Sequence, residues 1–176
     1  PIASALATAH AQGVFHGDVR PENIVVVGGL DAERPALKLL RFTLATRLAT
    51  GARAFSPQYG APEHFKKSFG ESSLGPPVDV YGLALCLIEL VTGQPALTGT
   101  STTELYKQTT DITRRPTLRA RGAEVSEAID LVVARALAVN PKLRWPTAKD
   151  FWSALTALPG LGALTEPTAI PITRRR

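Results

Sequence analysis

The stretch HGDVRPEN at residues 16–23 places a carboxylate, a guanidinium and an amide within six residues of one another. The carboxylate of Asp18 can accept a proton from an attacking hydroxyl group, or orient that group. Arg20 can neutralise charge on a transferring phosphoryl group, and the amide oxygen of Asn23 is a ligand that Mg²⁺ prefers. Pro21 stiffens the turn between them. The spacing favours a phosphoryl-transfer loop; a surface loop whose polar residues cap turns is the alternative.

The sequence around this loop predicts the elements that hold it. Residues 2–12 are rich in alanine with helical apolar spacing, and Gly13 is a suitable stop. Residues 24–27 are a β-branched run, the glycines at 28–29 supply a turn, and residues 36–42 are predicted to be the returning strand. The loop therefore joins the end of a helix to the start of a β-hairpin.

The rest of the chain has mainly helical patterns. The run at 79–92 is apolar nearly all round, so we expect it to be buried. Pro146 suits the first turn of a late helix. Segments 43–57 and 69–77 are predicted to be loops, and 62–67 one or two helical turns. The predicted fold is mainly α (α+β), with helices at 79–92, 102–109, 125–138 and 146–158.

Composition narrows the function classes. With 176 residues the chain can form one domain with a core. The net charge is +5, but no aromatic residues interleave with the arginines at 114–121, so we predict a solvated surface and no nucleic-acid site. Cys86 is the single cysteine. It is expected to be an inert core residue, and its isolation fits a reducing, cytoplasmic location.

The two ends of the chain suggest a larger context. The chain has no methionine and opens inside a helix-like pattern, which indicates a piece of a longer or processed polypeptide. The apolar run at 80–91 carries Glu89 and is too short to cross a bilayer. Residues 159–176 are rich in Gly, Pro and Thr and end in three arginines. We expect a flexible basic tail, which could lie at the cytoplasmic face of a membrane if a span followed it.

Two early motifs resemble those of protein kinases. HGDVRPEN at 16–23 is similar to the catalytic loop H-R-D-L-K-P-E-N. KLLRFTLA at 38–45 lies where kinases have K-L-x-D-F-G-x-A. Both motifs keep the order and approximate separation that kinases show.

Three later motifs extend the resemblance. SPQYGAPE at 56–63 is similar to the end of the kinase activation segment, and the run at 79–97 resembles the buried helix that begins D-V-Y. NPKLRWPTAKDF at 140–151 looks like the segment near the domain end. The resemblance, to bacterial serine/threonine kinases, implies a C-terminal lobe at 1–158, with the activation segment at 41–63.

The resemblance implies an activity and its residues. Kinases transfer the γ-phosphate of ATP to serine or threonine of a protein substrate. Here Asp18 would be the catalytic base, Arg20 would contact the phosphate, and Asn23 would bind Mg²⁺. Ser56 matches the position that forms a hydrogen bond to the catalytic aspartate.

Other matched residues imply architecture. Glu63 and Arg144 resemble the buried ion pair that ties the activation segment to the lobe. Asp79 resembles the acid that accepts backbone N–H groups of the catalytic loop; an ordinary helix cap is the alternative. His16 and Phe42 resemble two members of the stacked regulatory spine.

Several positions depart from the kinase pattern. Arg41 replaces the metal-binding aspartate, and a guanidinium cannot ligate a cation and would repel one. Arg41 could instead contact phosphate or Asp18, or be a decayed position. Thr43 replaces a glycine, Gly17 an arginine, and Arg20 a lysine. The expected result is an impaired kinase, or a catalytically dead pseudokinase that serves as a docking surface for other proteins.

The resemblance does not include the upstream half of a kinase. The Gly-rich loop, the strand lysine, its glutamate partner and the adenine hinge would all precede Pro1. We therefore expect this fragment alone to be inactive, and to expose apolar surface that a missing N-terminal lobe would cover. Small-molecule phosphotransferases of the aminoglycoside and choline kinase type share H-G-D-x-x-x-x-N, including Gly17. They match neither the A-P-E stretch nor the D-V-Y helix.

Overall fold

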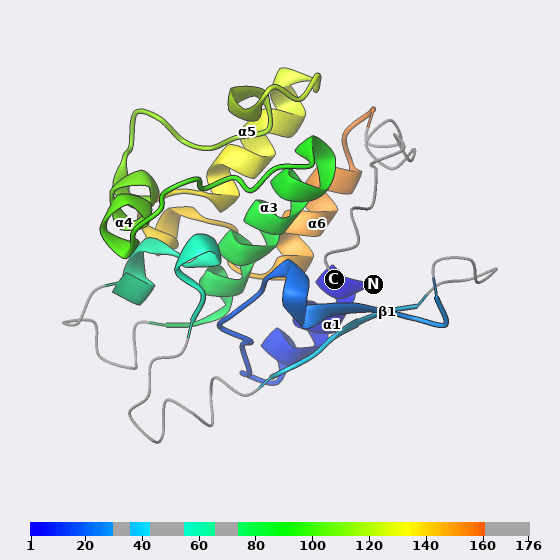
Figure 1. The fold of residues 1–176 in the computed structure, drawn as a ribbon. Coiled ribbons are helices and arrows are strands. Elements are labelled where there is room, and N and C mark those ends of the chain that lie inside the picture. Colours follow the sequence, from blue (N-terminus) through cyan, green and yellow to red (C-terminus); the bar gives the residue numbers. More distant parts are fainter. Residues whose placement is uncertain (30–35, 43–54, 66–73, 161–176) are drawn as a thin grey trace.

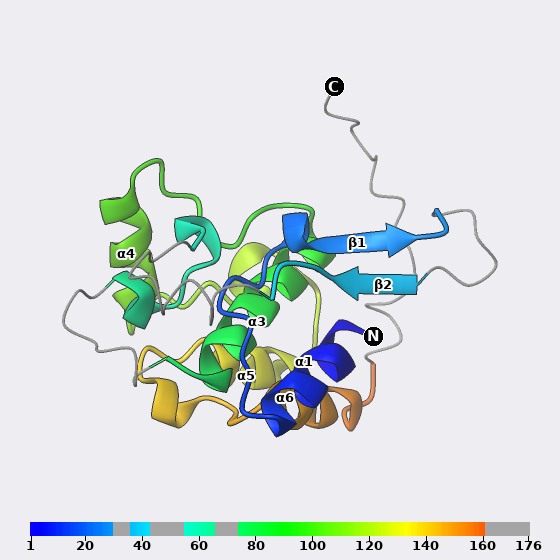
Figure 2. The same ribbon diagram turned by 90° about the horizontal axis from the view of Figure 1, so that it is seen from below.

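The computed structural model describes residues 1–29, 36–42, 55–65 and 74–160. The expectations for Thr43, for the loops within 43–54 and 66–73, and for most of the tail lie outside the described residues. Within them, helices form the body of the molecule and one hairpin projects from it (Figures 1 and 2). The mainly α fold with a short hairpin is thus as the sequence predicts.

Helix α3, Pro76–Thr92, lies at the centre of the helical body (Figure 1). It packs against α1 (Ile2–Ala11), α5 (Glu127–Ala136) and α6 (Ala148–Thr156). Helix α4, Thr102–Thr110, lies at the end opposite the hairpin in both views (Figures 1 and 2). The central position of α3 explains why its sequence is apolar nearly all round.

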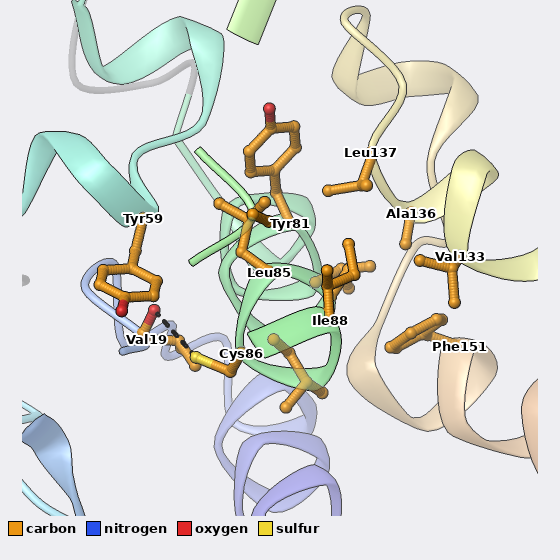
Figure 3. Close-up of a cluster of buried hydrophobic side chains, with 14 of the residues drawn as sticks. Val19, Tyr59, Tyr81, Leu85, Cys86, Ile88, Val133, Ala136, Leu137 and Phe151 are labelled. Atoms are coloured by element: carbon orange, nitrogen blue, oxygen red, sulfur yellow. Dashed lines mark hydrogen bonds between the residues drawn. The ribbon is translucent and has the colours of Figure 1, made fainter. Parts of the chain in front are cut away.

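The core forms on both sides of α3 (Figure 3). Leu85 and Ile88 lie on the side of α5 and α6, where Val133 and Phe151 complete the packing. On its other side, Cys86 is buried, and its Sγ lies 3.8 Å from the carbonyl oxygen of Val19 in the loop at 16–23. Burial raises the pKa of the Cys86 thiol, so the thiol stays protonated and inert.

Close packing between α3 and the loop requires a glycine. A Cβ atom added at Gly82 would lie 2.8 Å from the carbonyl oxygen of Val19, well inside contact distance. Val19 is itself buried, between Asp18 and Arg20. The absence of a side chain at Gly82 therefore lets α3 support the loop directly.

Three helices begin at different residues from those predicted, among them α5, which begins at Glu127 instead of Val125. Helix α3 begins at Pro76 instead of Asp79, because Pro76 and Pro77 occupy first-turn positions that need no N–H donor. Helix α6 begins at Ala148 instead of Pro146. Thr147 caps it in a capping box with Asp150, which leaves Pro146 outside the helix.

The hairpin pairs β1, Ile24–Val27, with β2, Ala36–Leu39, in antiparallel register. The predicted returning strand, which extended to Phe42, is too long. Pairing stops because Arg41 has a φ of 66°, in the left-handed region. A short 3₁₀ turn, η1 (Pro21–Asn23), directly precedes β1, and others follow the hairpin at η2 (Pro57–Tyr59), η3 (Pro62–Phe65), η5 (Arg119–Arg121) and η6 (Pro141–Leu143).

Candidate active site

Asp79, in helix α3, holds the start of the loop at 16–23. Its carboxylate is fully buried and accepts hydrogen bonds from the backbone N–H groups of His16, at 2.7 Å, and Gly17, at 2.6 Å. Gly17 has a φ of 78°, a conformation that glycine adopts without strain. Asp79 therefore holds the loop, and does not cap its own helix, which begins three residues earlier.

His10 completes this anchor. Its Nδ1 accepts from the backbone N–H of Ala148 at 3.3 Å, so the ring proton is on Nε2, which donates to Asp79 at 2.9 Å. The side chain is 1% exposed and joins α1, α3 and α6 at one point. Sequence reasoning missed His10; the signal available was a lone polar residue on the apolar face of a predicted helix.

His16 links the loop to the segment after β2. Its Nδ1 accepts from the backbone N–H of Asp18 at 3.1 Å, and its Nε2 therefore donates to the carbonyl oxygen of Leu40 at 2.7 Å. The ring of Phe42 packs edge-on against it, with ring centroids 4.8 Å apart. The expected His16–Phe42 contact is thus present, and it fixes the residues on both sides of Arg41.

The carboxylate of Asp18 is held by several groups and remains reachable. Its Oδ1 accepts from the backbone N–H of Ser56 at 2.9 Å, and its Oδ2 from Asn23 Nδ2 at 3.3 Å. Arg20 Nε lies 3.3 Å from Oδ2, close enough for an ion pair but without hydrogen-bond geometry. The Asp18 side chain is 22% exposed. An incoming hydroxyl group can therefore approach a carboxylate whose orientation is fixed.

Asn23 has one free acceptor. Its Nδ2 donates to the backbone oxygen of Asp18 at 2.8 Å, which fixes the amide orientation. Its Oδ1 is buried and has no hydrogen-bond partner among the described residues. A buried acceptor without a partner costs free energy, and a bound cation would satisfy it.

The remaining residues do not complete a Mg²⁺ site. Arg41 occupies the position where the kinase pattern has an aspartate, and its guanidinium cannot ligate a metal ion. The Asp18 carboxylate already faces three donors. In the part of the chain that the structure describes, no three His, Cys, Asp or Glu side chains come together. The residues fit one ligand of the ion, Asn23, and not the set that would bind it.

Glu63 and Arg144 form a buried bidentate ion pair. The Nη1–Oε1 and Nη2–Oε2 distances are 2.6 and 2.8 Å, and both side chains are at most 2% exposed. Arg144 also donates to the carbonyl oxygens of Ala138, Pro77 and Val139. The pair joins η3 to the start of α3 and to the turn after α5, and so holds the segment that carries Ser56.

A second contact fixes the same segment. The hydroxyl of Tyr59 donates to Glu89 of α3 at 2.5 Å. Burial, and then the negative charge of Glu89, raise the pKa of Tyr59, so the hydroxyl remains a donor. Sequence reasoning did not single out either residue. Together with the Glu63–Arg144 pair, this contact places the backbone N–H of Ser56 against Asp18.

A helical body, one short hairpin and a loop whose backbone N–H groups donate to the buried carboxylate of Asp79 define a kinase-like fold. The comparison with known families agrees, because the protein kinase domain family matches residues 1–154. The chain therefore belongs to the protein kinase domain family. This match favours protein kinases over the small-molecule phosphotransferases that share the HGD motif.

The relatives are bacterial serine/threonine kinases. The chain is 33% identical to the serine/threonine-protein kinase PknE of Mycobacterium tuberculosis over 175 residues, which cover 99% of the chain and 30% of PknE. It is 34% identical over 154 residues to PknB of Mycolicibacterium smegmatis, covering 83% of the chain and 23% of PknB.

A solved structure supports the fold. The crystal structure of the M. tuberculosis PknI kinase domain, a double mutant, matches with a TM-score of 0.60 and 27% identity. The match covers 89% of this chain and 50% of that one. The chain thus spans about half of a kinase domain and less than a third of these curated relatives. No helix among the described residues is long and apolar enough to span a membrane.

Proposed function

We propose that this chain is the C-terminal lobe of a serine/threonine protein kinase domain in which phosphoryl transfer is impaired. The observation that carries the proposal is the fixed, partly exposed carboxylate of Asp18, held by Ser56 and Asn23. Such a carboxylate can orient the hydroxyl of a protein serine or threonine and accept its proton. ATP would supply the phosphoryl group in the complete domain.

Arg20 has a supporting role in this proposal. Its guanidinium lies beside Asp18 and is about one-quarter exposed. From there it can stabilise negative charge on the transferring group. Asn23 fixes Asp18 through its amide N–H groups, so the loop retains its geometry without a metal ion.

Arg41 supports a second candidate, a pseudokinase that acts as a docking module. By resemblance it replaces the carboxylate that would complete a metal site together with the oxygen of Asn23. In a kinase, Mg²⁺ bridges the phosphates and neutralises their charge. A chain that keeps the loop but not the metal site retains the fold and loses most of the rate.

Transfer of labelled γ-phosphate from ATP to a mixed serine/threonine protein substrate tests the first candidate. We expect the full-length protein to transfer phosphate far below the roughly 1–100 s⁻¹ typical of kinases. Asp18→Asn should abolish what remains, because an amide cannot accept the proton. Lys149→Ala, at an exposed position on α6, is the matched control. An ordinary rate, or transfer that survives Asp18→Asn, would refute this proposal.

We further propose that an upstream lobe of the same polypeptide covers an apolar groove between α1, α3 and the hairpin. The groove has a volume of about 430 Å³, and Leu37, Leu83, Leu87 and Trp152 are among the residues that line it. Leu90, also in the lining, is 66% exposed. The matched relatives are much longer than this chain, so a further segment of the same polypeptide is the candidate that would cover the groove.

Dye binding tests the groove. The chain alone should bind the fluorescent dye ANS and self-associate, because exposed apolar surface of this kind favours both. Leu90→Lys should reduce both effects, whereas Leu131→Lys, at a similarly exposed residue of α5, should not. A monodisperse chain that leaves ANS fluorescence unchanged would contradict the proposal.

A further inference from the structure

A second hollow is lined in part by the end of α4 and the segment that follows it. Helix α4 lies at the end of the molecule opposite the hairpin (Figures 1 and 2). The hollow has a volume of about 600 Å³. The segment between α4 and η5 supplies most of its lining. Three of the lining residues are arginines, Arg114, Arg115 and Arg121, and the hollow is called the basic pocket below.

Arg115 forms a fixed, positively charged wall of the basic pocket. Its guanidinium donates to the carbonyl oxygens of Thr109, at 2.9 Å, and Asp111, at 3.0 Å, and also to that of Leu137. It donates to the hydroxyl of Tyr81 at 3.2 Å. None of these partners is a carboxylate, so the structure holds the cation without neutralising it.

The one carboxylate in the lining is used locally. Asp111 Oδ1 accepts from the backbone N–H and the hydroxyl of Thr113, and from the backbone N–H of Arg114. These bonds, the hydroxyl of Thr113 first, lower the pKa of Asp111. Asp111 is therefore ionised at neutral pH, and three arginines against one aspartate leave the lining with a net positive charge.

Arg114 and Arg121 are available to a ligand. Both are exposed, and neither forms an ion pair with a carboxylate among the described residues. A guanidinium group matches phosphate oxygens with two parallel N–H donors. Two such groups on the rim, with the fixed charge of Arg115 in the wall, suit a dianionic phosphate monoester.

The apolar part of the lining indicates what carries the phosphate. Leu97, Pro116 and Ala120 lie in the same lining as the arginines, and Leu97 is fully buried. Pro116 is buried as well, whereas Ala120 is exposed and can contact an aliphatic side chain beside the anion. No aromatic residue lines the pocket, so stacking of nucleic-acid bases has no support here.

We propose that the basic pocket binds a phosphorylated segment of a protein partner, with the phosphate on Arg114 and Arg121. An aliphatic neighbour of the phosphorylated residue would lie against Ala120. Binding here requires neither ATP nor the Asp18 loop. Its failure would therefore leave the proposed function intact, and the reverse also holds.

Fluorescence anisotropy with a labelled peptide, Gly-Leu-phosphoSer-Leu-Gly, tests the proposal. The chain should bind this peptide at least about tenfold more tightly than the same peptide with unmodified serine or with glutamate. The double variant Arg114→Ala/Arg121→Ala should weaken binding at least about tenfold, because charge-assisted hydrogen bonds are lost. Both residues are exposed, so we expect the far-UV circular dichroism to stay unchanged.

The control removes the same charge elsewhere. Lys142→Ala/Lys149→Ala changes two exposed lysines outside the lining and should leave the affinity unchanged. Equal weakening by both double variants would show non-specific attraction and overturn the proposal. So would equal binding of the glutamate peptide, of inorganic phosphate alone, or of a short oligodeoxythymidylate. In NMR spectra, peptide-induced shifts should centre on Gln108 and Ala120; shifts centred elsewhere would also overturn it.

Discussion

Arg144→Met should lower the free energy of unfolding by about 3–5 kcal/mol. The substitution removes the cation from a bidentate pair and leaves the Glu63 carboxylate buried at 3% exposure with no cation beside it. It also leaves the carbonyl oxygens of Ala138 and Val139 without a donor that the native chain supplies. Because domains have total stabilities of about 5–15 kcal/mol, the loss should be evident in urea denaturation.

A double variant separates charge from packing. Glu63→Leu/Arg144→Met removes both charges, and replacing a whole buried pair with apolar groups is often nearly neutral. We expect it to recover a large part of the stability that Arg144→Met loses. If Arg144→Met lowers the free energy of unfolding by less than about 1 kcal/mol, the Glu63–Arg144 pair does not hold the segment that carries Ser56 in place.

Arg41→Asp should restore metal-dependent transfer in the full-length protein. The backbone at residue 41 is left-handed, a conformation that aspartate tolerates better than most residues. The neighbours are already fixed, because His16 holds the carbonyl oxygen of Leu40 and the ring of Phe42. A carboxylate at this position, together with the free oxygen of Asn23, would give Mg²⁺ two protein ligands.

The expected size of this effect is large. A bound metal stabilises the transition-state charge by several kcal/mol, so transfer should rise on the order of 100-fold. Arg41→Asn tests the backbone alone, since asparagine tolerates the same conformation without adding a charge, and should give little gain. Arg41→Asp/Asp18→Asn should be inactive. An unchanged rate for Arg41→Asp would mean that residue 41 is not what limits the chemistry.

Two buried contacts of the candidate site join residues that lie in separate motifs. The contacts of Asp79 with the loop and of Glu63 with Arg144 are both present, although 63 and 81 residues separate the partners in the sequence. Such contacts can be predicted when each partner lies in a motif whose residues have known contacts in the family that the sequence resembles. His10 has no motif, so only the packing of α1 against α6 reveals that it completes the anchor.

The surface was harder to predict. The sequence predicts a solvated surface for the arginines at 114–121, because charge clusters usually form one. The structure shows that Arg115 is largely enclosed by backbone carbonyl groups, whereas Arg114 and Arg121 remain exposed. The difference depends on where α4 ends relative to the turn after α5, which helical periodicity does not specify. The same holds for the strand end at Leu39, which depends on the φ of Arg41.

We propose that this chain has a kinase-type transfer site without a complete metal site. Thermal denaturation of the full-length protein with ATP, in Mg²⁺ and in EDTA, tests it most directly. A ligand that binds only the folded state raises the melting temperature. We predict that ATP raises the melting temperature by the same amount in EDTA and in Mg²⁺, since Arg41 gives the metal ion no ligand. A rise that appears only with Mg²⁺ would contradict it.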